Sequence, residues 1–139
     1  MVIVKLGFSQ TESNANSSAK VVIYRPDQEF FLLNVAIFAN GKKICKLSNT
    51  RYLIYTASLG KLNINAHRGG YEFMKKETQL TLEVEADKTY YVLCNVKKTY
   101  IPNHHISYFE VEMFEVPETL AKIDLAKLKP DHCMTESFK

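Results

Sequence analysis

The chain has 139 residues, 46% of them hydrophobic and 12% aromatic, which suits one globular domain and excludes a disordered or low-complexity chain. Its net charge is only +3 and its basic residues are spread along the sequence, so no nucleic-acid-binding stripe is predicted. No run approaches the roughly 18 apolar residues expected of a membrane-spanning helix, so the protein is expected to be peripheral to a membrane at most.

The first 18 residues have two interpretations. Residues 2–6 are apolar, and residues 11–18 are polar and rich in Ser and Asn. This order is typical of a secretory signal remnant that runs into a polar linker, which would mean that the protein is exported. Residues 2–6 would alternatively form a first strand.

Eight segments after this linker are predicted to be strands, because they are rich in β-branched and aromatic residues or alternate between apolar and polar residues. Asn40-Gly41 separates two of them, and this pair is a strong hairpin signal because both residues tolerate a positive φ. The predicted strands are residues 20–25, 31–38, 42–47, 51–56, 61–67, 78–86, 89–96 and 106–116.

The alternation also predicts which side chains face the core. Leu62, Ile64 and Ala66 are expected to point inward, and the polar residues between them outward. Further inward residues are expected at Leu80, Leu82 and Val84, at Tyr90, Val92, Cys94 and Val96, and at Phe109, Val111 and Met113.

A helix is expected after Pro117, over residues 117–128, with a partial apolar stripe of Leu120, Ile123 and Leu128. Residues 129–139 are polar and are predicted to form a flexible tail. Short strands with turn signals every 8 to 12 residues are typical of an all-β antiparallel sandwich. We therefore predict a β-sandwich domain over residues 19–128, with about seven or eight strands and one short C-terminal helix.

Several pieces of this sequence, in this order, resemble a bacterial family of unknown function. They are Ala19–Pro26, Ala39–Ile44, Leu47–Tyr52, Leu59-Gly60 and Leu80–Tyr91. The family consists of envelope proteins, many of them lipoproteins, and the resemblance implies a transthyretin-like or immunoglobulin-like sandwich exported to the periplasm or cell envelope. One departure is Asp87, which stands where the family usually has Gly before Lys-Thr-Tyr-Tyr.

Three cysteines cannot all pair within one chain. Cys45, Cys94 and Cys133 have spacings that match no zinc or redox motif. The favoured interpretation is unbridged thiols, two buried and one in the tail, and a Cys45–Cys94 bridge is the alternative. No catalytic residue, cofactor or metal ligand is predicted, because His104 and His105 are adjacent and His132 lies in the predicted tail.

Residues that could bind a ligand or partner are Arg25, Tyr52, Tyr91 and Tyr100. Arginine can stack on aromatic rings or pair with a carboxylate, and tyrosines can serve as stacking platforms for sugars. Both residue types also have plain structural roles at strand ends and in half-buried sheets. The leading hypothesis is a non-enzymatic interaction domain that binds a protein or an envelope component; the alternative is a module that binds carbohydrate or another small ligand.

Overall fold

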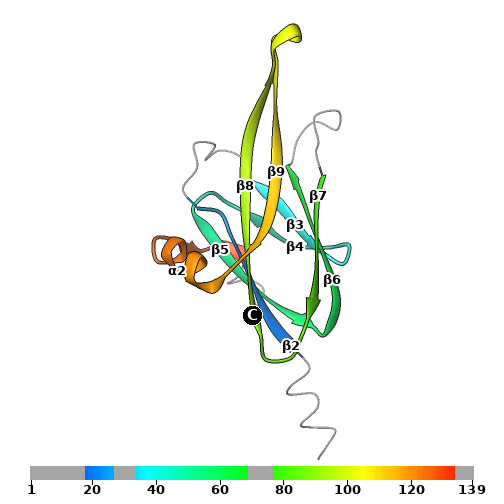
Figure 1. The fold of residues 1–139 in the computed structure, drawn as a ribbon, viewed down its shortest axis with the longest axis vertical. Helices are drawn as coiled ribbons and strands as arrows, with labels where there is room; N and C mark the ends of the chain where they lie inside the picture. Colours follow the sequence, from blue (N-terminus) through cyan, green and yellow to red (C-terminus); the bar gives the residue numbers. More distant parts are fainter. Residues whose placement is uncertain (1–17, 27–33, 69–76, 134–139) are drawn as a thin grey trace, which may run out of the picture.

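The computed structural model describes residues 18–26, 34–68 and 77–133, which form a sandwich of two sheets (Figure 1). The five-stranded sheet has the order β10-β5-β2-β8-β9, and the four-stranded sheet has the order β4-β3-β6-β7. The strands are β2 (Ser18–Tyr24), β3 (Val35–Ala39), β4 (Lys42–Leu47), β5 (Arg51–Ser58), β6 (Gly60–Arg68), β7 (Glu77–Val84), β8 (Thr89–Ile101), β9 (Ile106–Val116) and β10 (Lys129–Pro130).

The predicted all-β sandwich is confirmed. All eight predicted strands have a counterpart, and β4 and β9 have the predicted bounds. Residues 1–17, with the predicted signal segment, lie outside the described residues, as do residues 31–33 of the second predicted strand. Strand β8 runs five residues beyond its predicted end at Val96, because Lys97 through Ile101 continue to pair with β9.

The sequence predicted purely antiparallel sheets, but the five-stranded sheet contains two parallel pairs. Strand β2 pairs parallel with β8, and β10 pairs parallel with β5. Both pairs join strands that are far apart in the sequence, and local alternation carries no information on such pairings. After β2 the chain forms β3 and β4 and returns to pair antiparallel with β2 as β5. It then forms β6 and β7, and from Thr89 it pairs in parallel with the other side of β2.

The core between the two sheets agrees with the predicted inward residues. Leu62, Ile64 and Ala66 are at most 2% exposed, whereas the polar residues between them reach solvent. Other predicted core residues that are buried are Leu82, Val84, Val92, Cys94, Val96, Val111 and Met113. Leu80 and Tyr90 are only partly buried and pack against this core, and Phe109 lies outside the residues whose side chains are described.

The predicted Asn40-Gly41 turn joins β3 to β4. Asn40 has φ 49° and Gly41 has φ 85°, the left-handed pair that a tight hairpin needs. The Asn40 side chain also accepts a hydrogen bond from the Asn63 backbone amide at 2.9 Å, and the Asn40 backbone amide donates to the Asn63 carbonyl at 2.8 Å. The turn is therefore tied to β6 as well as to its own strands.

A third layer covers the outer face of the five-stranded sheet. Val22 and Tyr24 alternate with the core residues Val21 and Ile23, yet they too are buried. The element that covers this face is helix α2 (Glu118–Leu125), which lies beside β8 on the side away from the four-stranded sheet (Figure 1). Burial, and then the negative charge of Asp124 on α2, raise the pKa of Tyr24.

The predicted helix exists, but its predicted apolar stripe does not face the sheet. Ala121 is the buried residue of α2, whereas Leu120 is 55% and Ile123 is 61% exposed. A small residue at the contact lets the helix approach closely, and the large side chains then fall on the outer surface. The described helices include none that is long and apolar enough to cross a bilayer.

Candidate functional site

Arg25, one of the four predicted binding residues, lies inside the protein. Its side chain is 0% exposed and donates a hydrogen bond from Nη1 to the Leu47 carbonyl at 2.9 Å. Burial lowers the pKa of Arg25, while electrostatic interactions with Cys94 and Asp131 act in the opposite direction. Because the guanidinium is buried and hydrogen-bonded at the end of β4, Arg25 is not available to bind a ligand at the surface.

The three candidate tyrosines do not form one site. Tyr52 and Tyr91 are half-buried and share the outer face of the five-stranded sheet, on either side of β2. Tyr100 is 54% exposed and lies near the end of the β8–β9 hairpin, seven residues beyond the last β8 residue that pairs with β2. At roughly 3.3 Å per residue, this separates it from the other two by about 20 Å or more.

A segment that the sequence had assigned to a flexible tail is bound to the sandwich. We call residues 129–133 the C-terminal clamp. Its short strand β10 pairs with Arg51 and Tyr52, and the Asp131 amide donates to the Tyr52 carbonyl at 2.9 Å. Asp131 is 3% exposed. The tail prediction is therefore wrong for residues 129–133, and residues 134–139 lie outside the described part of the chain.

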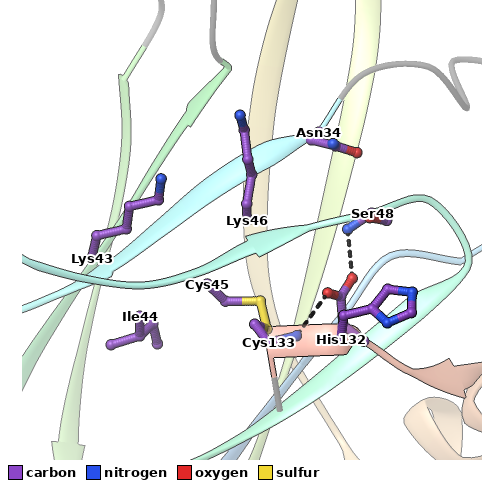
Figure 2. A pocket seen from close by; sticks show the side chains of 9 residues that line it. Asn34, Lys43, Ile44, Cys45, Lys46, Ser48, His132 and Cys133 are labelled. Carbon is purple, nitrogen blue, oxygen red and sulfur yellow. Dashed lines mark hydrogen bonds between the residues drawn. A yellow bond between two sulfur atoms is a disulfide. The ribbon is translucent and has the colours of Figure 1, made fainter. Parts of the chain in front are cut away.

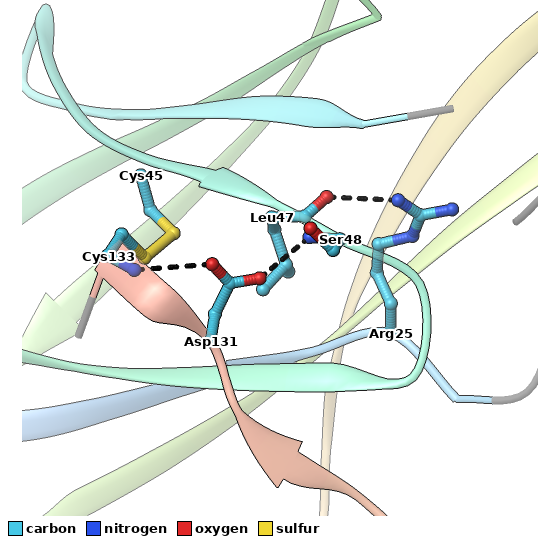
Figure 3. The surroundings of a disulfide bond; sticks show 6 residues. All are labelled: Arg25, Cys45, Leu47, Ser48, Asp131 and Cys133. Atoms are coloured by element: carbon cyan, nitrogen blue, oxygen red, sulfur yellow. Dashed lines mark hydrogen bonds between the residues drawn. A yellow bond between two sulfur atoms is a disulfide. The ribbon is translucent and has the colours of Figure 1, made fainter. Parts of the chain in front are cut away.

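The Asp131 carboxylate links the clamp to the four-stranded sheet. One oxygen accepts a hydrogen bond from the Ser48 amide at 2.9 Å, and the other accepts one from the Cys133 amide at 3.3 Å. Ser48 directly follows Leu47, the residue whose carbonyl binds Arg25, so the two buried charges act on neighbouring peptides (Figure 3). Together they fix the turn between β4 and β5.

A disulfide completes the clamp. Cys45 of β4 is bonded to Cys133 with a Cα–Cα distance of 5.5 Å, within the usual range for such bonds (Figure 3). This corrects both sequence-based interpretations. The three cysteines are not all thiols, and the partner of Cys45 is Cys133 instead of Cys94. Cys94 is a buried thiol, and burial raises its pKa from 9.0 to about 12. The partner was missed because Cys133 had been placed in a tail.

The clamp and β4 enclose a depression of about 450 Å³ (Figure 2). It is lined by the disulfide, by Ile44 and by polar and charged side chains. The side chains of Lys43 and Lys46 project from β4 in a similar direction in this view. The lining residues are Asn34, Lys43, Ile44, Cys45, Lys46, Ser48, Asp131, His132 and Cys133. No tyrosine is among them.

The donor atoms of Cys45, Asp131 and Cys133 lie within 4.8 Å of one another, as in a metal site. Both sulfur atoms belong to the disulfide, however, and the carboxylate already accepts two backbone hydrogen bonds. The contacts of the clamp therefore account for the closeness of these three side chains without a metal ion.

The outer surface of α2 carries the most exposed large apolar side chains of the described residues. Leu120 and Ile123 are one helical turn apart and so lie next to each other. They are flanked by the exposed ion pair of Lys122 and Glu118 at 2.8 Å. An apolar pair bordered by charges has the composition of the centre and rim of a protein interface.

These features define an all-β sandwich with a helical outer layer and a disulfide-tied C-terminal segment. The chain belongs to the family described as Protein of unknown function (DUF2846), whose model matches residues 15–107. The match contains β2 through β8, whereas α2 and Cys133 lie beyond it. Neither a curated protein nor a solved structure matches this chain.

Proposed function

We propose that this protein is an exported, non-enzymatic interaction domain of the bacterial cell envelope, and that it binds a protein partner through α2. The observation that carries the proposal is the outward orientation of Leu120 and Ile123. A helix that packs through Ala121 keeps two of its three large apolar side chains in water unless something covers them.

The disulfide supports the proposed compartment. Disulfides between structural cysteines persist in oxidising compartments and are rare in the cytosol. The Cys45–Cys133 bond closes a separation of 88 residues and anchors a segment that has only a two-residue strand of its own. The resemblance of about residues 19–116 to envelope proteins supports the same location.

Binding is favoured over catalysis because the buried ionisable groups have structural partners. Arg25 donates to the Leu47 carbonyl, and Asp131 accepts from two backbone amides. Cys94 is buried, and its raised pKa keeps the thiol protonated at neutral pH, where the reactive thiolate would be scarce. These three residues are therefore poor candidates for a nucleophile or a general base.

The alternative, a carbohydrate- or small-ligand-binding module, has weaker support. The depression beside the clamp has the volume of a small-ligand pocket, but no tyrosine from the described part of the chain lines it. Tyr52, Tyr91 and Tyr100 are distributed over two regions. A glycan-array screen that gave specific binding, lost in Lys46→Ala but kept in Lys61→Ala, would favour this alternative.

Site-specific photo-crosslinking in cells tests the main proposal. A benzoylphenylalanine at Ile123 is expected to give a defined adduct with one envelope protein, and Ile123→Ser is expected to weaken that complex when it is reconstituted. The control is the same crosslinker at Lys61, an exposed residue of β6 on the other sheet. Equal adducts at both positions, or recovery of the protein in the cytoplasmic fraction, would contradict the proposal.

A further inference from the structure

The β8–β9 hairpin extends well beyond the two sheets. Strand β2 pairs with β8 only as far as Leu93, and among the hairpin residues whose side chains are described, none nearer the tip than Val96 and Val111 is buried. Beyond them the two strands continue as a ribbon that projects from the sandwich (Figure 1). Two-stranded ribbons are marginally stable in water, so a projecting ribbon is more easily explained if its end has a binding surface.

The end of this ribbon, residues 98–107, is here called the hairpin tip. Each of its two faces carries an exposed large apolar side chain. Tyr100, on one face, is 54% exposed; Ile106, which pairs with Ile101 on the other, is 49% exposed. A flat protein surface would cover one face of the ribbon and leave the other in water. A medium that surrounds the tip would cover both.

The ionisable side chains of the tip include basic residues and no acidic ones. No Asp or Glu occurs from residue 98 through residue 109, whereas Lys98, His104 and His105 lie within this stretch. Lys98 and both histidines are exposed. The nearest acids, Glu110 and Glu112, lie lower on β9 and form ion pairs with Lys97 at 3.8 and 3.2 Å. The tip therefore complements an anionic surface.

The backbone sets the depth to which the tip can enter a bilayer. The β8–β9 ladder continues to Ile101 and Ile106, so groups that face across the ribbon are paired almost to its end. The outward edges of the ribbon have no neighbouring strand among the described residues, and unpaired backbone groups are not tolerated in hydrocarbon. Insertion is consequently limited to the headgroup region, where Tyr and His side chains find both apolar and polar surroundings.

We propose that the hairpin tip inserts into the headgroup region of a membrane that contains anionic lipids. The apolar side chains of Tyr100, Ile101 and Ile106 enter the interface, and Lys98 contacts the lipid phosphates. The tip and α2 lie in different parts of the molecule (Figure 1), so this inference deepens the proposed envelope role without depending on the α2 surface.

A tryptophan reporter tests the insertion, because the chain contains no Trp. In Tyr100→Trp, mixing with vesicles of phosphatidylethanolamine and phosphatidylglycerol should shift the emission to the blue and make it quenchable by brominated lipid. Leu120→Trp is the control, since Leu120 is equally exposed at 55% but lies on α2. A shift of the same size in both variants, or in neither, would overturn the proposal.

Co-sedimentation with the same vesicles tests the contributing residues. Ile106→Ser should weaken binding about fivefold, whereas the matched surface change Leu120→Ser should not. Lys98→Glu should weaken it about tenfold, and the same charge change at Lys61 should have a smaller effect. Vesicles of phosphatidylcholine alone should bind poorly. Equal losses of binding in the tip and control variants would overturn the proposal. A crosslinked adduct of Tyr100 with a single protein, together with no vesicle binding, would show that the tip binds a protein instead of a membrane.

Discussion

Arg25 shows how a single buried charge can fix the junction of several strands. It follows β2, reaches the end of β4, and lies near the Asp131 carboxylate of the clamp (Figure 3). A buried guanidinium is expensive to desolvate, so its hydrogen bond and opposite charge are needed to offset that cost. A residue in this position acts on stability and on the arrangement of the β4–β5 turn.

Arg25→Met is expected to lower the free energy of unfolding by about 2 to 3 kcal/mol, because the buried Leu47 carbonyl loses a charged donor and Asp131 loses an opposite charge. Urea denaturation measures this loss. The control is Arg51→Met, since Arg51 also donates to a backbone carbonyl, that of Pro130 at 3.4 Å, but from an exposed position. Its loss should be below about 1 kcal/mol. Similar losses in both variants would contradict the role assigned to Arg25.

Asp87 explains a family departure that the sequence had left open. It has φ 63°, in the left-handed region that favours glycine, and lies in the turn between β7 and β8. The glycine that the sequence resemblance implies at this point would suit that conformation, and Asp is among the residues that tolerate it best. The departure therefore keeps the turn instead of changing the fold.

At the scale of elements, the C-terminal clamp ties α2 to both sheets. Strand β10 adds only two residues to the edge of the five-stranded sheet, which is too little to hold a segment by itself. The Asp131 hydrogen bonds and the disulfide to β4 supply the remaining attachment. Because α2 lies between β9 and β10 in the chain, β9 holds the start of the helix and the clamp holds the segment that follows its end.

Loss of the disulfide should be costly, because it joins residues 88 apart and so restricts the unfolded chain strongly. Cys133→Ser is expected to lower the free energy of unfolding by about 2 to 4 kcal/mol in urea denaturation. Cys45→Ser is expected to destabilise the protein as well.

The double variant, Cys45→Ser with Cys133→Ser, is the control for additivity. If one bond is responsible, the free energy of unfolding of the double variant should be no lower than that of the less stable single variant. Dithiothreitol should destabilise the wild type but none of the three variants. Additive losses, or a wild type insensitive to dithiothreitol, would show that the two cysteines contribute separately.

At the scale of the whole molecule, the sandwich depends on a dry interior between its sheets. Cys94 lies in that interior at 0% exposure, among residues of both sheets. The folded protein holds the thiol proton up to a pH of about 12, whereas the unfolded chain releases it near its ordinary pKa of 9.0. Ionisation of this thiol is therefore linked to unfolding of the whole domain.

This linkage predicts a loss of stability at alkaline pH. Below about pH 9 the thiol is protonated in both states and its contribution is fully present. Between about pH 9 and 12 the unfolded chain alone ionises, so the free energy of unfolding should fall by about 1.4 kcal/mol per pH unit from this group. Urea denaturation of Cys94→Ala should show a shallower fall over this range than the wild type. Identical slopes for the two proteins would contradict the prediction.

Local patterns were sufficient for most of the fold. Alternation predicted the buried residues of β6, Leu82 and Val84 of β7, and Val111 and Met113 of β9, since a strand that covers a core must place every second side chain inside. Asn40-Gly41 predicted the β3–β4 hairpin because its conformation depends on those two residues alone. The resemblance to a family of unknown function was likewise carried by short pieces of sequence, and the family match confirms it.

The tertiary structure decided what depends on contacts between distant segments. The burial of Arg25, the Cys45–Cys133 bond and the attachment of residues 129–133 all join parts of the chain that are at least 22 residues apart. The outward orientation of Leu120 and Ile123 depends on which face of α2 meets the sheet, and Ala121 makes that contact. Sequence periodicity describes one element at a time, so it could identify these residues as apolar or ionisable but could not place them relative to one another.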